Sequence, residues 1–185
     1  MSTPLNKAVE AETELLVAFV NTLDLEEASD EVGEPAAFAD WIAGLSGDYI
    51  PVPDEDGHAR AIALRESLRA LLRANNGVAA SEEELAPLRE AAERSRYRTT
   101  LSADGQLNLA PARSDLSGFE ARLLLALERL QSLGAWPRLK ACTDERCQWA
   151  FFDATRNRSR TWCAMEVCGN REKTRRYRQR QDGTA

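Results

Sequence analysis

The chain has 185 residues and a formal net charge of −6, with 43% hydrophobic and 29% charged residues. This composition excludes a disordered chain and suits one medium-sized globular domain, with room for a small second one. The longest apolar run, from Leu15 to Val20, is six residues, too short to cross a bilayer or form a signal-peptide core, so we expect a soluble cytoplasmic protein.

The first half of the chain is predicted to form three helices. From about Leu5 to Leu23 the apolar residues fall near helical spacing, although residues 17–20 are also compatible with a strand. Pro35 suits the first turn of a second helix, because its missing N–H has no partner there, and apolar residues follow it at helical spacing. A third helix is predicted from about His58 to the stop signal Asn75-Asn76-Gly77.

Two further helices and one hairpin are predicted before residue 138. Ser81 and Glu84 have capping-box spacing and mark the start of a helix. Apolar residues alternate between Tyr97 and Ala110 around a central Asp-Gly, which is typical of a β-hairpin. Ser117 is predicted to cap a last helix that ends at Gly134. The fold class is therefore mainly α with one β-hairpin (α+β).

Nothing in this segment forms an obvious catalytic constellation, and we expect no enzyme. His58 near a helix start is more often solvated or capping than a base. The acidic run Asp54-Glu55-Asp56 lacks the spacing of a calcium loop and suits a solvated loop. Arg65, Arg69 and Arg73 share one helical stripe, which favours a solvated flank over the alternative of an anion pocket.

Charge and cysteine content divide the chain into two segments. Residues 1–137 hold 12 Lys and Arg against 24 Asp and Glu, a net charge of −12. Residues 138–185 hold 12 against 6, a net charge of +6, and contain all four cysteines. We therefore predict an acidic domain over 1–137 and a basic, cysteine-bearing domain over 138–185.

The cysteines follow the pattern C-x4-C-x15-C-x4-C at Cys142, Cys147, Cys163 and Cys168. Two close pairs separated by an excursion long enough for a hairpin suit a tetrahedral zinc site with four thiolate ligands. Disulfides would need an oxidising compartment, an iron–sulfur cluster usually has other spacings, and buried free thiols have no reason to cluster. The spacing therefore favours one zinc ion per chain.

The role predicted for this zinc is structural. A unit of about 40 residues rarely buries enough apolar surface to fold without a staple. Its own core would consist of Trp149, Phe151, Phe152 and Trp162. Four protein ligands also leave the metal no open position for water or substrate, which argues against zinc catalysis.

Basic residues form two sets in this segment, and ten of its twelve are arginine. The first set is predicted at the tip of the hairpin between the two cysteine pairs, and the second on a helix that begins at about Asn170. Arginine forms forked contacts with phosphate and guanine, so this bias favours nucleic-acid binding over a merely solvated tail. The predicted DNA-binding residues are Arg156, Asn157, Arg158, Arg160, Asn170, Arg171, Lys173, Arg175, Arg176, Arg178 and Arg180.

Two resemblances to known families add to this interpretation. The stretch Cys168-Gly169-Asn170-Arg171, with the cysteine pattern before it, resembles the CGNR zinc-finger family over residues 138–180. This resemblance implies a small treble-clef-like finger of a β-hairpin and a helix that binds DNA, with the four cysteines as zinc ligands. The segment 19–22, the segment 64–69 and the Asp-Gly hairpin resemble the ABATE domain that usually precedes this finger.

The ABATE resemblance implies a stress-related bacterial transcription regulator whose N-terminal domain binds an unidentified ligand. It makes Asn21, Thr22 and Arg65 candidates for the ligand pocket, whereas the residues alone favour a plain helix end at Asn21-Thr22.

The sequence therefore predicts a nucleoid-associated transcription regulator in which the helix from about Asn170 enters the major groove of duplex DNA. An RNA- or protein-binding adaptor is the alternative, and a homodimer is left open. The acidic domain is expected to attract its own basic finger and so to compete with DNA.

Overall fold

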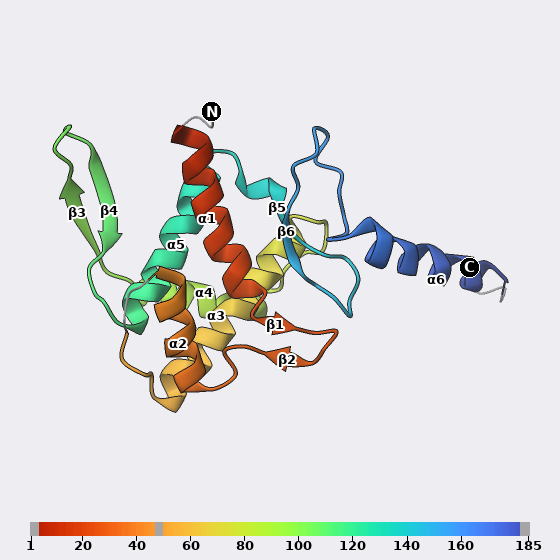
Figure 1. The fold of residues 1–185 in the computed structure, drawn as a ribbon, viewed down its shortest axis with the longest axis horizontal. Coiled ribbons are helices and arrows are strands. Elements are labelled where there is room, and N and C mark those ends of the chain that lie inside the picture. The colour runs from red at the N-terminus through yellow and green to blue at the C-terminus, as the bar shows by residue number, and fades with distance from the viewer. Residues whose placement is uncertain (1–3, 47–49, 182–185) are drawn as a thin grey trace.

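A body of helices carries a hairpin arm at one side and a projecting helix at the other (Figure 1). The computed structural model describes residues 4–46 and 50–181. The helices of the described body are α1 (Pro4–Val20), α2 (Pro35–Ser46), α3 (Glu55–Ala74), α4 (Glu82–Arg94) and α5 (Leu116–Ser132). The projecting helix is α6 (Asn170–Gln181), and a π-helical turn (Met165–Gly169) leads into it.

Short antiparallel strand pairs connect these helices. The pairs in the described residues are β1 (Leu23–Asp24) with β2 (Ser29–Asp30), β3 (Tyr97–Leu101) with β4 (Leu107–Pro111), and β5 (Leu139–Ala141) with β6 (Ala150–Phe152). A 3-10 turn (Trp136–Arg138) precedes β5. A mainly helical chain with small hairpins confirms the predicted fold class, although β1 and β2 were not predicted.

The hydrophobic core lies between α1, α2, α3 and α5. The ring of Phe119 on α5 meets that of Phe19 on α1 at 5.3 Å between centroids and that of Phe38 on α2 at 5.7 Å, both edge to face. Fully buried leucines of α3 and α5, including Leu68 and Leu123, fill the space beside these rings. Each such side chain contributes on the order of 1.5–3 kcal/mol through burial.

Side-chain caps define the helix starts, and two of them correct the sequence analysis. The predicted capping box of Ser81 and Glu84 opens α4. Asp54 accepts a hydrogen bond from the Gly57 N–H and caps α3, so the acidic run at 54–56 begins a helix instead of forming a solvated loop. Asp115, and not Ser117, caps α5, because its carboxylate accepts from the Gly118 N–H.

The finger's hairpin packs into the core of the helical body. Leu139, Ala141 and Ala150 are buried in the same cluster as the leucines of α3. The predicted separate core is wrong in part, because Phe152 packs against this shared cluster and Trp149 is 36% exposed. The hairpin also lies elsewhere than expected: β5 and β6 enclose the first cysteine pair, and a loop replaces the hairpin predicted between the two pairs.

Within the described residues, the helices are all too short or too polar to cross a membrane.

The shared core makes the finger and the helices one cooperative unit. Leu139 is fully buried between them, so Leu139→Ala should lower the free energy of unfolding by about 2–4 kcal/mol. Urea denaturation followed by circular dichroism, which reports the helices, and by tryptophan fluorescence should show coincident, shifted transitions. The control Leu133→Ala removes a side chain that is 41% exposed and should cost much less. Helices that keep their wild-type midpoint would contradict the shared core.

Candidate metal centre and nucleic-acid interface

The four cysteines converge from three segments of the finger. Cys142 directly follows β5, Cys147 lies in the turn before β6, Cys163 precedes the π-helical turn, and Cys168 lies within it. Their sulfur atoms all lie within 4.8 Å of one another. The turn carrying Cys147 is tight, because Asp144 O accepts hydrogen bonds from the N–H groups of both Cys147 and Gln148.

The sulfur geometry fits a tetrahedral metal ion. The Sγ atoms of Cys147 and Cys163 are 3.5 Å apart, and those of Cys163 and Cys168 are 3.7 Å apart. A tetrahedral ion with metal–sulfur bonds of about 2.3 Å holds its ligands about 3.8 Å from one another. A disulfide would need about 2.05 Å, and all four cysteines are free. The cluster therefore has the donor set and the size of a four-thiolate metal centre.

Ionisation of the thiols is coupled within this cluster. A hydrogen bond from the Cys147 thiol, helped by backbone N–H groups, lowers the pKa of Cys142 to about 5. Burial and the neighbouring Cys142 thiolate raise the pKa of Cys168 to about 12. One thiolate thus opposes formation of the next, and a bound cation would remove this conflict.

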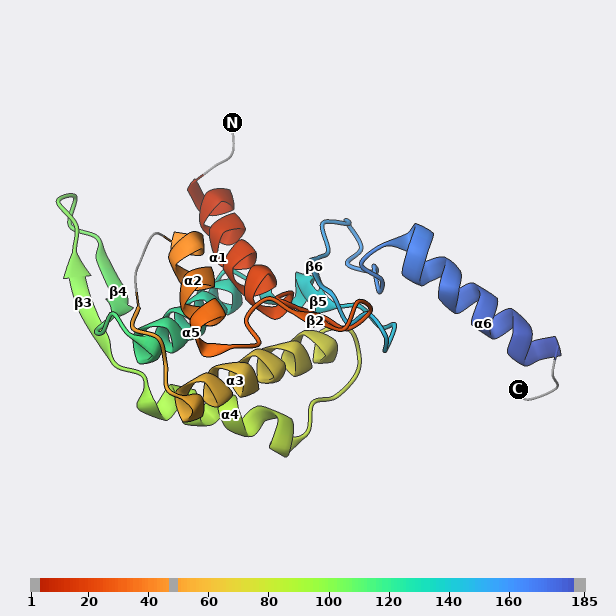
Figure 2. The ribbon, with the colours of Figure 1, turned by 60° about the horizontal axis from the view of Figure 1, so that its bottom comes forward.

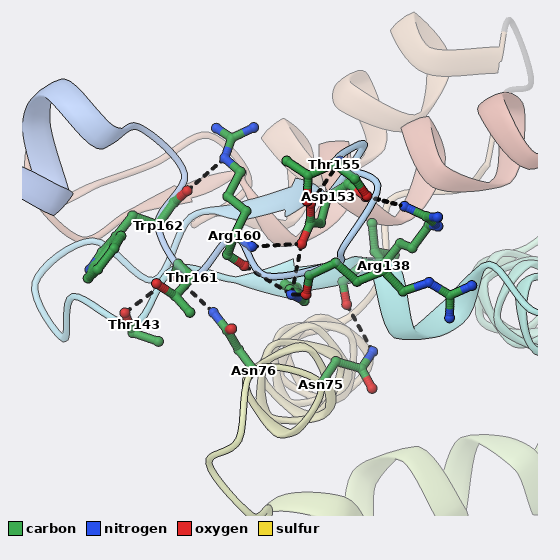
Figure 3. A network of polar contacts seen from close by, with 12 residues as sticks. Asn75, Asn76, Arg138, Thr143, Asp153, Thr155, Arg160, Thr161 and Trp162 are labelled. Atoms are coloured by element: carbon green, nitrogen blue, oxygen red, sulfur yellow. Dashed lines mark hydrogen bonds and ion pairs between the residues drawn. The ribbon is translucent and has the colours of Figure 1, made fainter.

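The C-terminal end of α3 holds the finger by its backbone (Figure 3). The side-chain amide of Asn75 donates to the carbonyls of Trp136 and Leu139, and that of Asn76 donates to those of Ala141 and Thr161, all at 2.9 Å. The sequence predicted this pair only as a helix stop. Its contacts were not foreseeable because the acceptors lie 61 to 85 residues away.

Two other side chains of the body bind the backbone around β6. Asn21 both donates to the Ala150 carbonyl and accepts from its N–H, at 3.0 and 2.7 Å. Arg69 donates to Gln148 O at 3.0 Å and to Val20 O at 2.7 Å. Arg69 and Arg65 are each only 2% exposed, so the prediction of a solvated arginine flank is wrong for both.

The candidate ligand residues are engaged within the chain itself. Arg65 forms a forked ion pair with Asp30, at 2.8 and 2.9 Å, and also donates to the hydroxyl of Thr22. Asn21 holds Ala150, as described above. Their role in ligand binding stays a prediction. His58 is buried and donates from Nε2 to Val32 O at 2.7 Å, so it is neither the solvated nor the helix-capping residue expected.

A buried ion pair shapes the arginine-rich loop that follows β6 (Figure 3). Lys140 Nζ lies 2.9 Å from Asp153 Oδ2 and also donates to the carbonyls of Arg158 and Arg160. Although burial opposes ionisation, hydrogen bonds from Thr155 and Lys140 hold the pKa of the Asp153 carboxyl well below its usual range. The loop is therefore fixed from inside by groups that do not face solvent.

This loop leaves all four of its predicted DNA-binding residues exposed: Arg156, Asn157, Arg158 and Arg160. The Arg160 guanidinium nevertheless lies 4.8 Å from the centroid of the Phe151 ring and donates to Trp162 O. Arg160 thus supports the loop and has less freedom to reach a phosphate.

Helix α6 projects away from the body in both views (Figures 1 and 2). Its first arginine, Arg171, donates to Asp144 at 3.0 Å and to Glu26 of the body at 2.5 Å. Three other predicted DNA-binding residues form no ion pair within the described part of the chain: Lys173, Arg178 and Arg180. Two more, Arg175 and Arg176, both pair with Glu172. Asn170 donates to Glu166 O and closes the turn before the helix.

A groove of about 590 Å³ runs between α6 and the turn from Cys142 to Cys147, called the first cysteine turn below. Arg146 lines it together with Arg171, Arg175 and Arg178. Arg146 was not among the predicted DNA-binding residues. Its position between Cys142 and Cys147 was the available signal, because the four sulfur atoms bring that turn close to the start of α6.

Two family models match the sequence. The CGNR zinc finger matches residues 138–181, and ABATE, described as "Putative stress-induced transcription regulator", matches residues 13–139, more than half of the chain. No curated protein matches the chain.

The sulfur cluster predicts a metal dependence of the finger. Inductively coupled plasma mass spectrometry should find about one divalent metal ion per molecule of the purified chain. Cys163→Ser should abolish this metal content. The control Ala164→Ser introduces the same hydroxymethyl group one residue away and should keep the ion. Because protons compete for thiolates, metal affinity should fall as the pH is lowered. Full metal content in Cys163→Ser would contradict a four-thiolate site.

Proposed function

The chain belongs to the ABATE family and ends in a CGNR zinc finger, and on this premise we propose that it is a transcription regulator that binds duplex DNA. The observation that carries the proposal is α6, which projects from the metal centre with unpaired, exposed cations. A helix of this kind fits the major groove, which is about 12 Å wide.

In this proposal the ion is Zn²⁺ and its role is structural. Cys142, Cys147, Cys163 and Cys168 would hold it, and it would offset half of the charge of the four thiolates. The chain's own residues then position α6: Cys168 lies in the turn before the helix, and Asp144 in the first cysteine turn accepts from Arg171. The direction of the helix follows from these two connections.

Contacts with DNA divide between the two exposed sets of arginines. The loop residues Arg156 and Arg158 contact the phosphate backbone, together with Arg146 at the rim of the groove. The α6 residues Lys173 and Arg180, which share one face of the helix, enter the major groove, and Arg178 on another face contacts a phosphate. Phosphate contacts supply affinity, and a few side chains read bases. Charge-based binding of this kind depends strongly on salt.

Fluorescence anisotropy with labelled duplex DNA tests this proposal on the full, metal-loaded chain. Log K against log salt should have a slope of about −4 to −7, since each phosphate contact contributes about −0.9. Arg178→Gln should weaken binding and reduce the slope by about one unit.

Arg89→Gln is the matched control, because Arg89 is an exposed arginine of α4 remote from α6 and should leave the slope unchanged. A wild-type chain that binds no duplex at low salt but binds hairpin RNA or an acidic protein would move the function to the adaptor alternative.

The body regulates DNA binding through the contact between Glu26 and Arg171 in this proposal. Glu26 lies in the loop between β1 and β2 and occupies a guanidinium that DNA phosphate would also bind. Arg65 holds β2 through Asp30. An anionic ligand that replaces Asp30 on Arg65 would release this loop and free Arg171.

Neutralising Glu26 should therefore tighten DNA binding. We expect Glu26→Gln to increase the affinity several-fold at low salt, because it removes a competing carboxylate. Glu27→Gln makes the same charge change on the adjacent residue, which has no ion pair with Arg171 in the described structure, and should have a much smaller effect. If the two variants raise the DNA affinity equally, the effect comes from net charge alone and not from the contact between Glu26 and Arg171.

A further inference from the structure

The β3–β4 hairpin is an arm that exposes large apolar side chains. It projects from the body on the side opposite to α6 (Figures 1 and 2). The register pairs Leu101 with Leu107 and Thr99 with Leu109, so these side chains share one face. Leu101 is 68% exposed, Leu107 72% and Leu109 51%. Grouped leucines exposed to this degree mark interaction surfaces on soluble proteins.

The leucine face, defined by Tyr97, Leu101, Leu107 and Leu109, is exposed to solvent. On the opposite face, half-buried Ala110 lines a cavity together with Arg98 and Phe119 of α5, and Pro111 at the base of the hairpin lines the same cavity. The body therefore contacts the base of the hairpin, and within the described residues it leaves the three leucines uncovered.

Charge indicates what can approach this face. Residues 97–111 contain one Arg and one Asp, a net charge of zero, within a segment whose net charge is −12. A second copy of the acidic body is repelled over most of its surface and least at this neutral arm. Neutrality and an apolar face together favour a second copy over a basic or strongly charged partner.

The strands also have free edges. Within residues 4–46 and 50–181, β3 and β4 hydrogen-bond as strands only with each other. A lone two-stranded hairpin is marginally stable in water, and a partner that covers one face stabilises it. A two-fold axis brings identical faces together, so an apolar face is complementary to itself.

We propose that the leucine face is a homodimer interface that packs against the same face of a second copy. Five-residue strands span about 17 Å, and two of them are about 10 Å wide. This surface is far smaller than the roughly 800 Å² per partner of a stable complex, so the dimer is weak and forms only at high protein concentration.

Sedimentation equilibrium of the full, metal-loaded chain tests the interface. The average mass should rise from the monomer's 20.5 kDa towards twice this value between about 1 and 200 μM. Leu101→Lys with Leu107→Glu places opposite charges across one cross-strand pair, which preserves the hairpin and removes the apolar contact. This double variant should remain monomeric over the same range.

The matched control is Thr100→Lys with Asn108→Glu, the adjacent cross-strand pair on the opposite face, which should dimerise like the wild type. The proposal is overturned if the wild-type chain stays monomeric over the whole concentration range. It is equally overturned if the monomer instead binds phospholipid vesicles through the leucines. A dimer that persists in the Leu101→Lys/Leu107→Glu variant also overturns it.

Discussion

The hydrogen bonds from the end of α3 to the finger's backbone are the constraint on which the rest of the C-terminal structure depends. Asn75 and Asn76 bind four carbonyls on both sides of the first cysteine turn, and β5 lies against the leucines of α3. The sulfur cluster then connects this anchored turn to the start of α6. The body therefore positions the β5–β6 hairpin, this hairpin positions the sulfur cluster, and the cluster positions α6.

Buried charges reinforce this arrangement at three points. Arg65 with Asp30 fixes the β1–β2 hairpin, Arg69 joins α1 to the first cysteine turn, and Lys140 with Asp153 fixes the arginine loop. Desolvation makes such groups costly, and their attraction offsets the cost only with good geometry and added hydrogen bonds. The Arg65–Asp30 and Lys140–Asp153 pairs have both, and together with Arg69 they define one loop conformation where an apolar contact would allow several.

Local patterns in the sequence predicted the elements that local physics determines. Helical spacing and the Ser81 capping box predicted the helices, and the Asp-Gly pattern predicted the β3–β4 arm. The cysteine spacing predicted the cluster of four sulfur atoms. The errors concern distant partners. Arg65 looked solvated because Asp30, 35 residues earlier, lies in a two-residue strand with no periodic signal. The prediction of a separate finger core was wrong because α3 supplies the apolar surface that the finger packs against. The sequence of the finger alone does not reveal this surface.

The shared core also governs the fate of incomplete chains. A chain that stops before Leu139 leaves the apolar surface of α3 uncovered and the amides of Asn75 and Asn76 without their carbonyl partners. Such a product exposes the surface that chaperones and proteases recognise. Cellular quality control would thus remove copies that lack the finger. The packing that orients the finger therefore also makes the helical body depend on a complete chain.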